Sequence, residues 1–217
     1  MSDDNSNLVA VQADDIELEG ELIIPEGAEG LVVFAHGAGS SRHSPRNNFV
    51  AESLRERGLG TLLFDLLTEQ EDLHRASRFD IDLLTRRLDA ATEWLRGRDD
   101  AVDLRLGYFG SSTGAAAALR AAARRDDIAA VVSRGGRVDL ATDQLPSVTA
   151  PTLCIVGGDD QQVLALNRQA LGRLDAEKNL HVVPGAGHLF EGTGELEEVA
   201  TVAGEWFQRH LSGEQYE

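Results

Sequence analysis

One short stretch restricts the fold of this chain more than any other feature of the sequence. Residues 106–119 read LGYFGSSTGAAAAL, an apolar run that passes through a glycine-rich turn into an alanine-rich segment with strong helix propensity. The turn from Gly110 to Gly114 fits the pattern G-x-S-x-G, which places a serine at a tight strand-to-helix turn. Its glycines let neighbouring backbone approach without a Cβ clash, and the helix N-terminus favours a developing negative charge. The pattern therefore predicts that Ser112 is a nucleophile.

Two other interpretations of this stretch must be weighed. An ordinary turn between a strand and a helix, built from small residues, would look the same, so the rest of the chain has to decide. A phosphate-binding loop would require Gly-Lys-Ser/Thr, and the only lysine of the chain is Lys178. We therefore set the phosphate-binding loop aside.

Apolar runs alternate with helix-like segments along most of the chain. Continuous apolar runs, typical of strands buried on both faces, occur at residues 31–35, 61–64, 106–110, 128–132, 152–156 and 180–183. Residues 8–24 carry a period-2 pattern that indicates an antiparallel hairpin at a sheet edge. Together they predict an α/β fold with a doubly wound, mostly parallel sheet. We expect one domain over residues 1–217, with a core at about 31–211 and edge strands within 1–30. The interval 135–150 is too short for a cap domain.

Polar residues that follow the expected strands could act together with a nucleophilic serine. In an open parallel sheet, ligands bind beyond the carboxyl ends of the strands. Asp159 and Asp160 follow the run 152–156, and His188 follows the last run. The chain order is therefore serine, aspartate, histidine, as in the triads found on such sheets. In these triads the histidine takes the serine proton and the aspartate fixes the histidine tautomer.

With these residues in place, the chain resembles the α/β-hydrolases, and most of all the small, capless serine hydrolases grouped with dienelactone hydrolase. The resemblance covers roughly residues 31–211 and implies a triad of Ser112, Asp160 and His188. The segment GGDDQQV matches the family's G-x-x-D-x-x-V at Asp160, whereas Asp159 would shift the register. Asp159 remains a rival for the role of the acid.

The same resemblance implies an oxyanion hole and a reaction class. The hole would use the backbone amides of Thr113 and of Ala38, which lies in the segment His-Gly-Ala-Gly. Dienelactone hydrolases have a cysteine nucleophile whereas position 112 is serine, so dienelactone specificity is not carried over. The expected function is hydrolysis of small carboxylic esters through an acyl-serine, with no metal and no cofactor. A thioesterase or peptidase on the same triad, and a non-catalytic binding protein of the same fold, are the alternatives.

The charge of the chain restricts its partners. Acidic residues number 37 against 20 basic ones, for a net charge of −17, so nucleic acid and anionic membranes would be repelled. An acid excess with a single lysine resembles the proteins of extreme halophiles; the alternative is an acidic mesophilic protein from a GC-rich genome. The N-terminus shows no signal-peptide pattern, and no apolar run is long enough to span a membrane. We expect a soluble, cytoplasmic monomer or homodimer whose partner is a small-molecule ester.

Four arginines are expected near the carboxyl edge of the sheet. Arg42 and Arg46 follow the run 31–35, and Arg134 and Arg137 follow the run 128–132. In one interpretation they pair with nearby carboxylates and tie loops together. In the other, Arg42 and Arg134 hold an anionic group of the substrate through bidentate hydrogen bonds.

Overall fold

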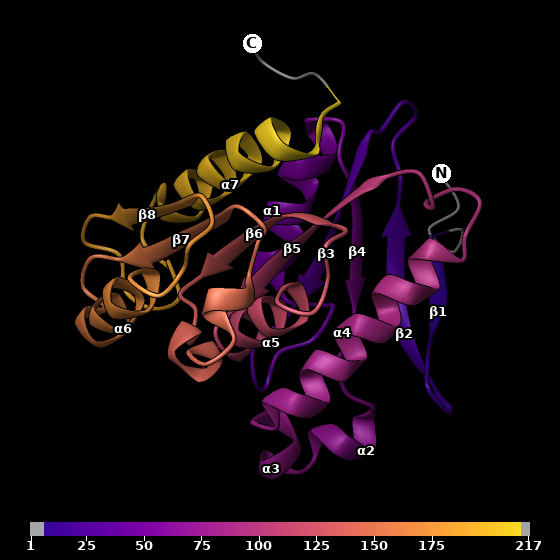
Figure 1. Ribbon diagram of the computed structural model, residues 1–217, viewed down its shortest axis with the longest axis horizontal. Helices are drawn as coiled ribbons and strands as arrows, with labels where there is room; N and C mark the ends of the chain where they lie inside the picture. The colour runs from indigo at the N-terminus through magenta and orange to yellow at the C-terminus, as the bar shows by residue number, and fades with distance from the viewer. Residues whose placement is uncertain (1–6, 214–217) are drawn as a thin grey trace.

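The computed structural model describes residues 7–213 and is built around an eight-stranded sheet (Figure 1). Its strands are β1 (Leu8–Ala13), β2 (Ile16–Ile23), β3 (Gly30–Ala35), β4 (Gly60–Phe64), β5 (Arg105–Ser111), β6 (Ile128–Arg134), β7 (Thr152–Gly157) and β8 (Lys178–Val183). Their order across the sheet is β1-β2-β4-β3-β5-β6-β7-β8. β2 is antiparallel to β1 and β4, while all pairs from β4 to β8 are parallel. The mostly parallel sheet and its N-terminal edge hairpin are thus confirmed.

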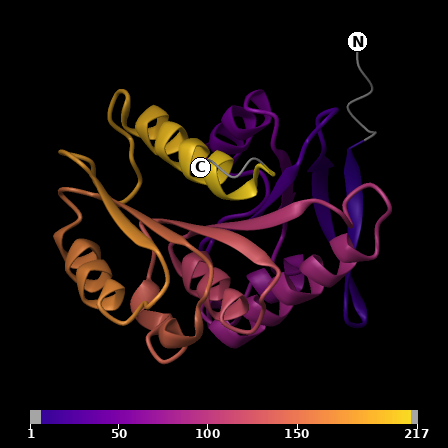
Figure 2. The same ribbon diagram turned by 45° about the horizontal axis from the view of Figure 1, so that its top comes forward.

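Helices cover both faces of this sheet (Figure 2). On one face lie α1 (Pro45–Glu56) and α7 (Glu195–Leu211), drawn in purple and yellow, and on the other lie α4 (Ile81–Arg96), α5 (Thr113–Ala122) and α6 (Gln161–Leu171). Each face has its own apolar core, because strands buried on both faces send alternate side chains into each. The doubly wound α/β arrangement expected from the sequence is confirmed.

The chain between β6 and β7 is short, as expected. It contains two 3₁₀ turns, η1 (Val138–Ala141) and η2 (Leu145–Ser147), and no separate cap domain is evident. The carboxyl edge of the sheet is therefore not covered by an inserted domain at this point.

The segment 69–78 differs from the expectation. Its charge predicts a loop, but it contains the single-turn helices α2 (Glu69–Asp72) and α3 (Arg75–Arg78). A capping box opens α2: the Thr68 hydroxyl accepts from the Glu71 amide at 3.2 Å, and the Glu71 carboxylate accepts from the Thr68 amide at 2.9 Å. Neither helix has a buried residue, so local polar contacts rather than apolar packing define them.

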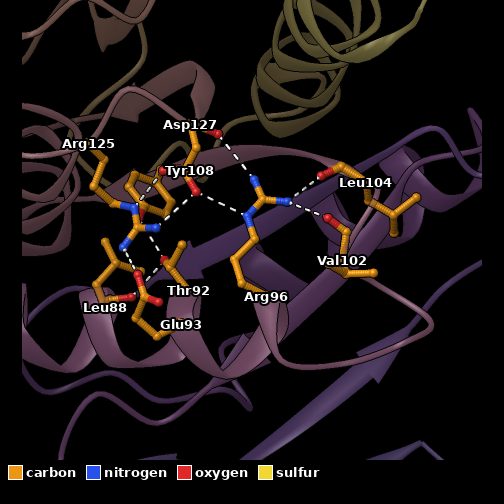
Figure 3. Close-up of polar contacts among 9 residues, drawn as sticks. All are labelled: Leu88, Thr92, Glu93, Arg96, Val102, Leu104, Tyr108, Arg125 and Asp127. Carbon is orange, nitrogen blue, oxygen red and sulfur yellow. Dashed lines mark hydrogen bonds and ion pairs between the residues drawn. The ribbon is translucent and has the colours of Figure 1, made fainter.

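A polar network joins α4 to β5 and to the segment before β6 (Figure 3). Asp127 Oδ2 accepts from Arg96 Nε at 3.0 Å, and Asp127 Oδ1 accepts from Arg125 Nε at 2.7 Å. Within α4, Thr92 Oγ1 lies 2.7 Å from the hydroxyl of Tyr108, which is fully buried in β5. Burial raises the pKa of Tyr108 well above its usual value, so the phenol stays neutral. The Thr92–Tyr108 contact thus joins α4 to β5, and the contacts of Asp127 join α4 to the segment before β6.

Candidate active site

The turn between β5 and α5 holds Ser112 in a strained backbone conformation. Ser112 has φ 50° and ψ −121°, a region that costs a non-glycine residue about 1–3 kcal/mol. Packing requires both glycines of the motif. A Cβ on Gly110 would lie 2.4 Å from the Cα of Ala115, and one on Gly114 would lie 2.1 Å from the carbonyl oxygen of Ala35. The turn predicted from G-x-S-x-G is therefore present, with Ser112 between strand and helix.

The structure pairs His188 with Asp160. Asp160 Oδ2 lies 2.6 Å from His188 Nδ1, and the Asp160 side chain is mostly buried, at 14% exposure. Asp160 stands between β7 and α6, and His188 lies in the loop after β8. Asp159 is exposed, and its amide donates to the carbonyl of Ala186 at 3.0 Å. Of the two candidate acids, Asp160 is the one in contact with the histidine.

The imidazole of His188 lies close to the nucleophile turn. A Cβ on Gly135, which has φ 53°, would sit 3.4 Å from His188 Cε1 and Nδ1. Gly135 directly follows Arg134, whose carbonyl accepts from the Ser112 amide at 3.2 Å. No hydrogen bond joins the Ser112 hydroxyl to His188 among residues 7–213. Catalytic hydrogen bonds are often long in free enzymes and tighten when substrate binds.

The loop that carries His188 is anchored to the sheet face that α1 and α7 cover. Phe190 is 3% exposed, adopts φ 54° and packs in the apolar core under α7. Its amide donates to the Gly187 carbonyl at 3.4 Å, which closes a turn around His188. Glu191 pairs with Arg46 of α1 at 2.7 Å. Sequence reasoning did not assign Phe190 or Glu191 to the site, and an apolar residue inside a polar loop was the only signal for Phe190. The pairing of Arg46 agrees with the interpretation in which the arginines bind nearby carboxylates.

The loop after β3 is fixed by His36. The Leu66 amide donates to His36 Nε2 at 2.9 Å, so His36 Nδ1 carries the hydrogen and donates to the Gly37 carbonyl at 3.0 Å. Burial lowers the pKa of His36, which keeps the ring neutral. His36 therefore holds this loop in place.

The two amides expected in the oxyanion hole differ in their surroundings. The Thr113 amide begins α5, where helix geometry provides no partner. The Ala38 amide instead donates to Oγ1 of Thr113 at 2.9 Å. The Thr113 amide is thus left without a helical acceptor, whereas the Ala38 amide is engaged by a side chain; the use of both amides as oxyanion donors stays a prediction.

Arg42 has both ends of its guanidinium bound to carboxylates. Its Nη1 lies 2.5 Å from Asp65 Oδ2 and its Nη2 lies 2.6 Å from Glu19 Oε2. The Arg42 amide also donates to Asp65 Oδ1 at 2.8 Å. These contacts favour the interpretation in which Arg42 ties loops together, because no guanidinium edge is left for a substrate anion.

Arg134 has no carboxylate partner among the described residues. It is 9% exposed, and its Nη2 donates to Asn47 Oδ1 at 3.3 Å, while Nη1 is buried without an acceptor in residues 7–213. Burial, assisted by the nearby charge of Arg46, lowers the pKa of Arg134 to about 10, so the group remains a cation at neutral pH. It is a buried positive charge at the end of β6, beside the nucleophile turn.

Two hollows in the surface differ in their position and in the charge of their lining. One of about 420 Å³ lies beside the loop after β3, and carboxylates dominate its charged lining: Glu17, Glu19, Asp65, Glu69 and Asp72. A larger one of about 980 Å³ is lined by residues near the C-terminus of α7 and the start of β5, at the opposite edge of the sheet. Of these two, the smaller hollow is the one lined by residues of the β3 loop.

A family model described as an alpha/beta hydrolase domain matches residues 28–201 of this chain. The chain belongs to the α/β-hydrolase family. The hydrolase is similar to a dienelactone hydrolase from Anabaena variabilis, whose crystal structure superposes with a TM-score of 0.93 at 54% sequence identity over 94% of this chain and 97% of that one. It also shares its fold with Est1E from Butyrivibrio proteoclasticus, at a TM-score of 0.80 and 18% identity, over 94% and 99% of the two chains.

One curated relative is named as a member of another enzyme class. A protein of Mycobacterium tuberculosis, provisionally named a phosphoribosyl transferase, is 56% identical over 206 residues. The match spans 94% of the hydrolase but only 46% of that relative, so the chain covers about half its length.

Residues 7–213 contain no group of three histidine, cysteine or carboxylate side chains arranged to hold a metal ion. Within the same range, no helix combines the length and apolar character that a bilayer crossing requires.

Proposed function

We propose that this hydrolase cleaves carboxylic esters of modest size through an acyl-serine intermediate. The observation that carries the proposal is the 2.6 Å contact between Asp160 Oδ2 and His188 Nδ1, at the same sheet edge as the strained Ser112. A carboxylate bound at Nδ1 holds the imidazole in the tautomer whose Nε2 can accept a proton. A general base needs that state.

The reaction would follow from these three side chains. Ser112 Oγ attacks the acyl carbon while His188 Nε2 takes the hydroxyl proton, and the carbonyl oxygen becomes an oxyanion at the N-terminus of α5. The intermediate collapses, the bond to the alcohol oxygen breaks, and the alcohol leaves with the proton from His188. Water then attacks the acyl-serine by the same steps, which releases the acid and restores Ser112.

Similarity to a dienelactone hydrolase supports an ester as the substrate, because a lactone is a cyclic ester. The absence of an inserted cap between β6 and β7 favours small esters, since an open site gives little enclosure for a long acyl chain. The transferase name is not carried over, because it describes a protein of which this chain matches 46%.

Arg134 is the candidate for binding an anionic group on the substrate. It has a buried Nη1 without an acceptor among residues 7–213, and an unpaired buried donor is costly. The acidic hollow beside the β3 loop would repel such an anion. An anionic substituent would therefore be directed toward β6.

A panel of chromogenic esters of increasing acyl length tests the proposed reaction. We expect hydrolysis of short-chain esters that Ser112→Ala abolishes and Ser111→Ala largely retains. Thioesters and peptides in the same panel test the other acyl-transfer reactions, and higher kcat/KM on either would replace ester hydrolysis as the conclusion. A folded wild type inert toward all three classes would favour a non-catalytic binding protein.

A further inference from the structure

The Ala38 amide, which the family resemblance implies as the second donor of the oxyanion hole, already has an acceptor. A backbone amide has one hydrogen, and the Ala38 amide directs its hydrogen to Thr113 Oγ1 at 2.9 Å. Thr113 is 2% exposed, so solvent does not compete for this contact. An oxyanion would therefore contact the Thr113 amide and Oγ1 of Thr113, which accepts from the Ala38 amide.

The hydroxyl of Thr113 keeps a hydrogen to donate. A threonine hydroxyl has one donor and two acceptor positions, and the bond from Ala38 is the only one that this hydroxyl makes among residues 7–213. Buried threonines in α4 behave differently: Thr85 Oγ1 donates to the Ile81 carbonyl at 2.6 Å, and Thr92 Oγ1 donates to the Leu88 carbonyl at 2.9 Å. Thr113 is the first residue of α5 and has no helical carbonyl one turn earlier. Its hydrogen is available to another acceptor.

The position of this hydroxyl suits an oxyanion. Thr113 directly follows the nucleophile, and the β3 loop lies against the turn, since a Cβ on Gly37 would be 3.0 Å from the Cβ of Ser112. An amide that donates to a hydroxyl also polarises it and strengthens the hydrogen bond that the hydroxyl donates. The Ala38 amide can thus act on the oxyanion through Thr113.

We propose that the Thr113 hydroxyl is a catalytic oxyanion donor, with the Ala38 amide behind it. The inference rests on the proposed hydrolase reaction. Rotation of the hydroxyl away from Ala38 would instead free that amide for the substrate. It would leave a buried hydroxyl without its partner, and the β-branched side chain has few rotamers to choose from. The hydroxyl therefore stays in place and donates.

The test compares Thr113→Val, which replaces the hydroxyl with a methyl group of similar size, with Thr113→Ser, which retains it. On a neutral chromogenic ester we expect Thr113→Val to lower kcat by about 10²–10³-fold with little change in KM, as for other oxyanion donors. Thr113→Ser should stay within about 10-fold of the wild type. The rate at which a fluorophosphonate labels Ser112 should fall in parallel, because its phosphoryl oxygen occupies the same hole. Thr85→Val is the matched control, since it removes a buried helix hydroxyl and should lower Tm without lowering kcat.

The outcomes separate this inference from the reaction itself. A wild type that hydrolyses esters, with Thr113→Val as fast or faster, would show that the hydroxyl only blocks the Ala38 amide and would overturn the inference alone. Equal losses in Thr113→Val and Thr113→Ser would also overturn it, because the hydroxyl would then not be the group that matters. A wild type that neither hydrolyses nor labels would refute the proposed function and the inference together.

Discussion

Asp159 and Asp160 are adjacent in sequence but have different environments. Asp160 reaches His188 while Asp159 is exposed. We expect Asp160→Asn to lower kcat by about 10⁴-fold, because an amide would stabilise the wrong histidine tautomer. Asp159→Asn is the control and should cost far less. Steady-state kinetics on one ester measure both, and the reverse ranking would reassign the acid.

Arg134 offers a test of substrate charge. We expect Arg134→Met to raise KM at least about 10-fold for an ester that bears a carboxylate, because a lost charged hydrogen bond costs about 1.5–3 kcal/mol. A neutral ester of the same acyl length should be nearly unaffected. Methionine keeps the apolar stem packed, so folding should survive the change. Equal losses on both esters would assign Arg134 to structure.

The site residues show which structural details can be predicted from the sequence. Register within a motif selects Ser112 and Asp160, because spacing along one segment fixes which side chain faces the site. Side-chain partners from distant segments are not visible in this way. Arg42 contacts Glu19 of β2 and Asp65, which follows β4, and the Ala38 amide donates to the Thr113 side chain, so both contacts depend on how distant segments pack.

Among the helices and strands, the sequence predicts the strands with strong apolar runs but not the short helix that begins with a capping box. The buried strands are predicted from continuous apolar runs, since few other structures suit such runs. The turn at Ser112 is predicted from the spacing of its glycines. α2 depends on the reciprocal capping of Thr68 and Glu71 and buries no residue, so hydropathy gives no signal for it. α1 begins at Pro45, because Ser44 caps it and proline suits the first helical turn.

The hydrogen bonds of Asp127 join α4 to the start of β6, and their contribution to stability can be measured. Hydrogen bonds from Arg125, then from Arg96, lower the pKa of Asp127 to about 2. The unfolded value is about 3.9. The stabilisation is therefore present above about pH 4 and is lost as pH falls toward about 2. We expect Asp127→Asn to lower Tm at pH 7 by about 2–4 °C, or about 1 kcal/mol at this partial exposure.

Thermal melts at several pH values measure this effect. The difference between wild type and Asp127→Asn should shrink as pH falls from about 4 to about 2. Asp100→Asn is the control, because that carboxylate is exposed and pairs only with Arg98 two residues away. A pH-independent difference for Asp127→Asn would show that packing, not charge, is lost.

For the whole molecule, the sequence predicts the layer architecture but not the strand order. Alternation of apolar runs with helices implies a parallel, doubly wound sheet. The placement of β3 between β4 and β5 depends on contacts between segments far apart in the chain. The hairpin β1–β2 could be assigned to an edge because its alternating polarity suits only a half-exposed position.

The net charge of −17 leads to a prediction about salt. Self-repulsion among excess carboxylates destabilises the compact state, and at about 1 M salt it is screened over about 3 Å. The same screening weakens the arginine–carboxylate pairs on the surface, so the sign of the change shows which effect dominates. We expect Tm to rise from dilute buffer to molar salt, as the halophile interpretation requires. A Tm that stays flat or falls would contradict that interpretation.

Ser112 is the proposed nucleophile of an acyl-transfer site. The most direct measurement is to react the protein with a fluorophosphonate, digest it and locate the adduct by mass spectrometry. We predict a single adduct on Ser112, unchanged in Ser111→Ala, and abolished in Ser112→Ala even though that variant melts as the wild type does. An adduct on Ser111, or none on a folded wild-type protein, would contradict the claim.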